Sequence, residues 1–444
     1  MTQTTLPEST PAQRRKSSLM RRAWIVTGLL VVFMLVNNAD KTVIAFGGVQ
    51  IQKDLGLSPE QFGVVQSGFY WLFAAGALFF GWLSSRVSIR WLLAGLMLMW
   101  VATMIPLLGT VGFGVLLTCR IILGFAEGPA FALSNHAVHS WFPAEKRALA
   151  GGVVSAGASV GTLLAAPFLS WMIVTWNWHA AFYVLIGLGL VWTLAWLLMG
   201  KGAPDATEQN ASAKVLEAVD APYRLILKTG TVIGITLVTF CSYWSTTLKV
   251  AWLPVYLTDG LGYDTLTTGR LVMLPYGLAA VGAIAAGWTS NRLIARGVSR
   301  RIARGYLAAG LVASAGVCMA AFTVLSTGVV QIALVSLAFS LNTAAYGVAM
   351  SAVADVAPAN KRGMVLGGLG AVASISGMIA PLLLGFTVGG AADKVSGYGT
   401  GFVISGALMV VGSAIAVFLV DPDRDITLIR KRVGAVGDKV EVTA

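Results

Sequence analysis

The sequence predicts an all-α membrane protein with twelve transmembrane helices in two pseudo-symmetric six-helix bundles. The first observation is composition: the 444 residues are 57% hydrophobic and 11% charged, whereas charged residues make up about a quarter of a soluble domain. The second is that apolar runs of about twenty residues, long enough to cross a bilayer, recur along the chain. The third is that short motifs of the first half return in the second.

The expected spans are apolar runs of bilayer length with few charges. They cover residues 23–46, 61–83, 91–110, 112–141, 148–174, 178–199, 229–257, 266–289, 303–325, 328–355, 362–389 and 398–420. They divide the chain into an N-terminal tail (1–22), a first bundle (23–199), a linker (200–228), a second bundle (229–420) and a C-terminal tail (421–444). We expect the tails to be unstructured and the linker to be solvated.

The basic residues indicate topology rather than a nucleic-acid partner. The formal net charge is +12, and the cations gather before the first span and in the even-numbered loops. The positive-inside rule therefore places both termini in the cytoplasm. The first apolar run is too long for a signal peptide. We expect a monomeric multi-pass protein of a cell membrane, such as a bacterial inner membrane.

Three motifs repeat between the two halves. Gly81-Trp-Leu-Ser-Ser-Arg86 returns as Gly287-Trp-Thr-Ser-Asn-Arg292, and Pro143-Ala-Glu-Lys-Arg147 returns as Pro358-Ala-Asn-Lys-Arg362. A glycine pair followed by a proline in the fifth span has a counterpart in the eleventh. The offsets of 206 to 216 residues match a half of six spans, which predicts two halves in parallel orientation.

The fourth span carries two ionisable residues, Arg120 and Glu127, inside an apolar run. A charge at the bilayer centre costs roughly 3 kcal/mol, and such groups usually mark a substrate or proton path. Seven residues are nearly two helical turns, so both side chains lie on one face and can share a cavity. The alternative is an ion pair that only fixes packing. Gly124 and the Gly128-Pro129 pair predict a close helix contact or a hinge.

The first span adds a second polar cluster at Asn37, Asp40 and Lys41. Adjacent residues point about 100° apart on a helix, so Asp40 and Lys41 are not expected to neutralise each other fully. We expect one of them to face Arg120 or Glu127.

These motifs resemble a known family. Arg120-Ile-Ile-Leu-Gly-Phe-Ala-Glu127-Gly-Pro, followed by Trp141-Phe-Pro-Ala-Glu-Lys-Arg147, resembles the fourth-span signature of the anion:cation symporter family of the major facilitator superfamily. Three further segments match by position: Asn37-x-x-Asp40-Lys41, Trp178-His-Ala-Ala-Phe182 and Trp252-Leu-Pro-Val-Tyr-Leu257. The resemblance implies the major facilitator fold and proton-driven uptake of an organic anion, mostly sugar acids and other carboxylates, by rocking of the two halves.

The resemblance also implies residue roles. Asp40 and Glu127 would handle protons, while Lys41 and Arg120 would position the anion or the coupled acids. Lys41 stands where the family usually has Arg, so it offers a point charge instead of a bidentate fork. The second-span loop motif has Ser where the superfamily has Asp, so the cytoplasmic gate would depend on cations of this loop and its repeat, namely Arg86, Arg90 and Arg292.

Other departures from the family bear on the substrate. Where members that carry sugar acids often have Tyr, Gln, Gln and Asn, this chain has Phe73, Ala77, Ala158 and Ser374. Sugar hydroxyls would be left unpaired there, at about 1–3 kcal/mol for each buried group. The sequence therefore favours a less hydroxylated acid, either an aromatic or a short aliphatic carboxylate.

Three more polar residues are candidates for the substrate cavity. Lys249 of the seventh span would add a second cationic contact, or would extend along the helix to the outer interface. Asn342 and Tyr346, one turn apart in the tenth span, would line the cavity or make an interhelical contact.

The residues do not assemble an enzyme active site. The three cysteines, Cys119, Cys241 and Cys318, are isolated in apolar runs, and the Gly-rich segments lack a phosphate-binding loop. We expect no cofactor and no metal, and partners limited to a small organic anion, protons and the lipid bilayer. The alternatives are a proton-coupled exporter of a lipophilic compound and a membrane sensor that does not transport.

Overall fold

The computed structural model describes residues 11–142, 144–200, 221–358 and 361–441, and these are helical apart from short connections. The first half contains α1 (Pro11–Phe46), α2 (Gly48–Leu55), α3 (Pro59–Trp71), α4 (Phe73–Leu83), α5 (Ile89–Met104), α6 (Phe113–Glu127), α7 (Ala130–Trp141), α8 (Ala144–Thr175) and α9 (Trp178–Met199). The second contains α10 (Tyr223–Leu227), α11 (Gly230–Ala251), α12 (Leu253–Val255), α13 (Thr265–Ala295), α14 (Leu307–Ala321), α15 (Val329–Val356), α16 (Arg362–Gly389), α17 (Lys394–Leu419) and α18 (Pro422–Glu441).

The predicted spans correspond to these helices. Within the described residues, 11 helices are long and apolar enough to cross a membrane, and the fifth span contributes a shorter apolar helix over Gly161–Thr175. The fourth span is interrupted at Gly128-Pro129, between α6 and α7, as the sequence predicted. The fold is that of an all-α protein with two six-helix bundles.

Two expectations about the tails were wrong where the structure describes them. The first helix begins at Pro11, well before the predicted span, so residues 11–22 are not unstructured. At the other end, α18 makes a helix of the predicted C-terminal tail. Residues 1–10 and 442–444, and 201–220 of the linker, lie outside the described residues.

The helix starts repeat between the halves at the same offsets as the sequence motifs. Ser58 begins α3 and Asp264 begins α13; Asn177 begins α9 and Asp393 begins α17. In each case the side-chain oxygen accepts a hydrogen bond from the backbone N–H three residues later, which satisfies an otherwise unpaired helix donor. The internal repeat is therefore a repeat of local structure.

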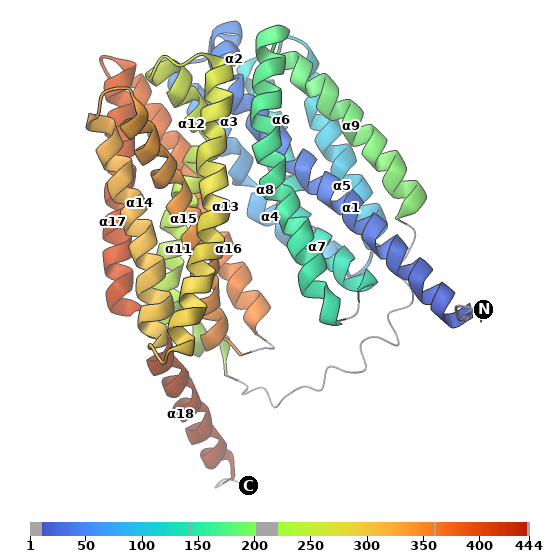
Figure 1. Ribbon diagram of the computed structural model, residues 1–444, viewed down its shortest axis with the longest axis vertical. Coiled ribbons are helices and arrows are strands. Elements are labelled where there is room, and N and C mark those ends of the chain that lie inside the picture. The colour runs from blue at the N-terminus through green and yellow to red at the C-terminus, as the bar shows by residue number, and fades with distance from the viewer. Residues whose placement is uncertain (1–10, 143, 201–220, 359–360, 442–444) are drawn as a thin grey trace, which may run out of the picture.

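The two bundles approach each other at the end opposite the two termini and spread apart at the end that carries them (Figure 1). At the closed end Gly63 of α3 lies against Gly385 of α16, where a Cβ atom on either glycine would crowd the opposite backbone. The Ser67 hydroxyl donates a hydrogen bond of 2.6 Å to the carbonyl oxygen of Met378. These contacts join α3 to α16 across the halves.

Candidate transport site

The buried charges are positioned by a close contact between α3 and α6. A Cβ atom at Gly124 would overlap the carbonyl group of Phe69, and one at Gly128 would overlap that of Phe73. Because glycine stands at both positions, the backbone of α6 and of the residue after it touches α3 and the start of α4. The Phe69 ring then lies beside two cations, with Arg120 5.0 Å and Lys41 5.7 Å from its centroid.

Lys41 of α1 forms an ion pair with Glu127 of α6, with 2.5 Å between Nζ and Oε2. The Lys41 side chain is 19% exposed, and that of Glu127 is fully buried. Lys41 also donates to the Asn37 side-chain oxygen at 2.9 Å. The sequence left Arg120 and Glu127 as possible partners for this cluster, and the ion-pair partner is Glu127. The alternative of an Arg120–Glu127 ion pair does not occur.

Asp40 and Arg120 lie behind this pair and are almost completely buried, at 1% and 4% exposure. They help to line a cavity of about 10 Å³, close to the smallest volume that holds one water molecule. Asp40 is near enough to interact electrostatically with Glu127, and Arg120 interacts with both carboxylates. Four ionisable groups therefore form one buried cluster in the first bundle.

Gln66 connects this cluster to the second bundle. Its side-chain oxygen accepts a hydrogen bond of 3.2 Å from Arg120 Nη2, and its amide nitrogen donates one of 2.8 Å to the carbonyl oxygen of Ala251. Ala251 ends α11, two residues after Lys249. Movement of the halves would therefore change the bond between Gln66 and Ala251, and Gln66 is a direct partner of Arg120.

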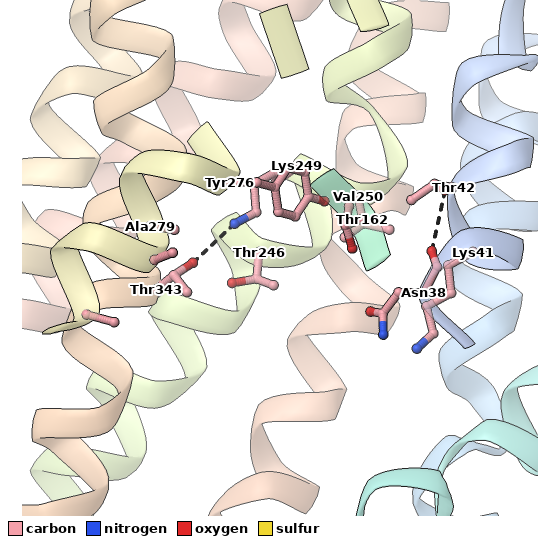
Figure 2. Close-up of a pocket in the computed structure, with 12 residues that line it drawn as sticks. Asn38, Lys41, Thr42, Thr162, Thr246, Lys249, Val250, Tyr276, Ala279 and Thr343 are labelled. Carbon is pink, nitrogen blue, oxygen red and sulfur yellow. Dashed lines mark hydrogen bonds between the residues drawn. The ribbon is translucent and has the colours of Figure 1, made fainter. Parts of the chain in front are cut away.

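A larger cavity, of about 260 Å³, lies between the two bundles. Figure 2 shows Lys41 on one side of it and Lys249 on the other. It is lined by Asn38, Lys41 and Thr42 of α1, Thr162 of α8, Thr246, Lys249 and Val250 of α11, Tyr276, Ala279, Ala280 and Ala283 of α13, and Thr343 of α15. The sequence predicted that both charged spans would face such a chamber. Of the four clustered ionisable residues, only Lys41 reaches its lining.

Lys249 is buried, at 3% exposure. Its ammonium donates to the Phe339 carbonyl oxygen at 3.0 Å and to the Thr343 hydroxyl at 3.1 Å, and lies 4.6 Å from the centre of the Tyr276 ring. The alternative of a lysine extending to the outer interface is therefore wrong.

None of the other predicted substrate residues whose side chains the structure describes lines this cavity. Asn342 instead joins α15 to α11 through hydrogen bonds of 2.9 Å to Ser242 and Thr246, and Ser374 bonds its own helix. Phe73 packs beside Phe69 and Tyr70, and Tyr346 is 38% exposed. The side chain of Ala158 lies outside the described part of α8.

The predicted gating arginines contact their own halves. Arg86 lies over the Trp82 ring and Arg292 over the Trp288 ring, at 4.2 and 5.0 Å, so the repeated motif makes the same cation–π contact twice. The guanidinium of Arg90 donates to the carbonyl oxygen of Leu197. A gating role for all three stays a prediction.

Several site residues were missed by sequence reasoning. Gln66 was detectable, because an amide inside an apolar span usually bonds a neighbouring helix. Thr246 and Thr343 gave little signal, since Thr in a membrane helix commonly bonds its own backbone. Tyr276 contacts Lys249 only through tertiary packing.

The comparisons with known proteins agree with this architecture. The family model described as "Major Facilitator Superfamily" matches residues 28–381. The chain belongs to the major facilitator superfamily. It is therefore a member of a family of membrane transporters and not an enzyme.

Among curated proteins, the chain is 27% identical to the "Probable sulfoacetate transporter" of Cupriavidus necator, over 89% of this chain and 93% of that one. It is also 27% identical to the "D-galactonate transporter" of Escherichia coli O6:H1, over 90% and 96% of the two chains. These relatives support a transporter of organic anions.

Among solved structures, a bacterial homologue of the human lysosomal transporter Spinster superposes with a TM-score of 0.77 at 16% identity, over 92% of this chain and 98% of that one. A D-xylose–proton symporter gives 0.73 at 16% identity, over 90% and 98%. At this identity they show the shared fold.

Proposed function

We propose that this protein takes up a small organic anion together with protons, by exposing its central cavity alternately to the two sides of the membrane. The observation that carries the proposal is the 2.5 Å contact between Lys41, a cation on the cavity wall, and the buried acid Glu127. One side chain is accessible to an anion, and its partner can hold a proton.

This contact suggests how a proton and an anion are coupled. While Glu127 is ionised, its carboxylate is the ion-pair partner of the Lys41 ammonium. A proton on Glu127 removes that competing charge, so Lys41 becomes available to the substrate anion. Each ligand then favours binding of the other, as linkage requires. Asp40, close to Glu127, is the second group that could hold a proton.

The cavity lining supports a substrate with fewer hydroxyl groups than a sugar acid. Ala279, Ala280, Ala283 and Val250 form the apolar part of its wall, and polyol hydroxyls would find no partners against that part. Of the two relatives, the one named for sulfoacetate fits this lining better than the one named for D-galactonate. We therefore favour a short carboxylate.

The experiment compares wild type with Glu127→Gln in proteoliposomes. The amide keeps the volume of the acid but cannot carry a proton in exchange, so we expect anion exchange to remain and accumulation driven by a pH gradient to be lost. Asp423→Asn is the control, because Asp423 is a surface acid paired with Arg300. Undiminished pH-driven accumulation by Glu127→Gln would reject the coupling role.

We also propose that both termini face the cytoplasm of a cell membrane. The support is that both chain ends lie at the same end of the bundles (Figure 1), and that Arg86 follows α4 and Arg292 lies in the last turn of α13. Protease access to a C-terminal tag in sealed spheroplasts tests the orientation, because a cytoplasmic tag is protected until lysis.

A further inference from the structure

Lys249 lies on the cavity wall and has no counterion among the described residues. Both of its hydrogen-bond acceptors, a carbonyl and a hydroxyl, are neutral, and no carboxylate among the described residues lies within ion-pair distance of its Nζ. Taking a charge out of water costs several kcal/mol unless an opposite charge compensates. An anionic group in the cavity would supply that charge.

The second cation of the cavity, Lys41, lies on the opposite bundle (Figure 2). Its own counterion, Glu127, is behind the cavity wall. Once Glu127 is protonated, the cavity presents two cations, one from α1 and one from α11, with hydroxyls of Thr42, Thr246 and Thr343 around them.

We propose that the substrate is a small dianion, with two anionic groups on a short chain, which Lys249 binds at one end and Lys41 at the other. This rests on the proposed function and names its substrate class. A cavity of about 260 Å³ is smaller than the roughly 300–1,000 Å³ of sites for drug-sized ligands. Because the two lysines belong to different halves, such a substrate contacts both bundles at once.

A purely structural role for Lys249 would give different results. The lysine ties α11 to α15 through Phe339 and Thr343, so its loss could lower stability. If the role of Lys249 is only structural, its removal would reduce the transport of all anions by a similar factor. If Lys249 anchors one end of the substrate, its removal would abolish the preference for acids with two charges over acids with one.

The experiment uses full-length protein in proteoliposomes with an inward proton gradient and a neutral external solution. Succinate and butyrate share a four-carbon chain but carry two carboxylates and one, and malonate and propionate form a three-carbon pair. We expect wild type to prefer each diacid by at least about tenfold in kcat/KM, since tenfold corresponds to one modest charge contact. Lys249→Met should raise the KM for succinate about tenfold or more and change that for butyrate less than about threefold.

Two controls accompany this variant. Lys249→Arg keeps the charge and should retain most of the diacid preference. Lys394→Met removes a lysine that pairs with Asp259 away from the cavity and should leave every substrate unchanged. Thermal unfolding of each purified variant reports whether it is folded.

The outcomes separate the inference from the proposed function. If wild type carries butyrate as well as succinate, or if folded Lys249→Met weakens both equally, the dianion inference is wrong while anion transport stands. If wild type carries none of the four acids nor any other organic anion, the proposed function fails and the inference fails with it. The wild-type preference decides the matter even if Lys249→Met does not fold.

Discussion

The two bundles make the same helix contact with different chemistry. The repeat that aligns Pro143 with Pro358 also aligns Glu127 of α6 with Asn342 of α15. In the first bundle, Glu127 meets Lys41 of α1 as an ion pair. In the second, Asn342 bonds Ser242 and Thr246 of α11 as a neutral amide. The equivalent position is thus an acid in the first bundle and an amide in the second.

The halves therefore differ in how their buried charged groups are paired. A buried ion pair is strongly coupled, because removing one partner leaves an uncompensated charge at a cost of about 3–5 kcal/mol. In the first bundle this ion pair includes Glu127, and a proton on Glu127 would neutralise its charge. In the described part of the second bundle, Lys249 has only neutral partners. This difference agrees with our proposal that the first half responds to protons and the second binds an anion.

The largest effect is expected from removing Arg120. Arg120→Ala would leave Asp40 and Glu127 with one cation fewer in a buried cluster, so transport should fall by at least about 100-fold, in keeping with the cost of an uncompensated buried charge. The repeat aligns Arg120 with Val335 of α15, so Val335→Ala is the matched control and should retain most activity. Uptake at equal membrane abundance measures both. Near-normal uptake by Arg120→Ala would contradict a role for the cluster.

A second change would make the second bundle resemble the first. Thr343→Asp places a carboxylate beside Lys249, whose Nζ is 3.1 Å from the Thr343 hydroxyl. The built-in counterion should weaken anion affinity by about tenfold or more, because a charged contact of about 1.5 kcal/mol is lost. Thr343→Asn has nearly the same shape without charge and should bind more tightly than the Asp variant. Equal affinities in the two variants would argue against anion binding at Lys249.

The smallest effect concerns two equivalent helix starts outside the membrane spans. Hydrogen bonds from Thr267 lower the pKa of the Asp264 carboxyl below its ordinary value, whereas the equivalent cap, Ser58, does not titrate. The cap of α13 should therefore be complete above the ordinary Asp pKa and lost as the pH falls through the lowered one. Hydrogen exchange should show lower protection for the Thr267 amide in acid and constant protection for that of Gln61. Asp264→Asn should remove the difference.

Much of the fold was predictable because each level of the sequence agrees with it. Hydropathy placed the spans, and repeated motifs related the halves. Gly124 and the Gly128-Pro129 pair predicted the close contact and the break at α6. The polar composition of residues 11–22 and α18 gave no span-like hydropathy signal, although α18 does repeat apolar residues at helical spacing, at Ile426, Ile429 and Val433.

The site was less predictable than the fold. Charge in an apolar span indicated Arg120, Glu127, Asp40 and Lys41, because burial of charge is costly wherever it occurs. Which of them reaches the cavity depends on helix rotation and packing, which the sequence does not specify. For Asn342 the sequence left open the cavity or an interhelical contact, and its amide makes the interhelical contact, with α11.

The most direct test of the central claim is the pH dependence of anion binding to purified wild type and to Glu127→Gln. Isothermal titration calorimetry with succinate measures the affinity at each pH. If a proton on Glu127 frees Lys41, wild-type affinity rises as the pH falls, and Glu127→Gln binds tightly at every pH. The same pH dependence in both proteins would contradict the account.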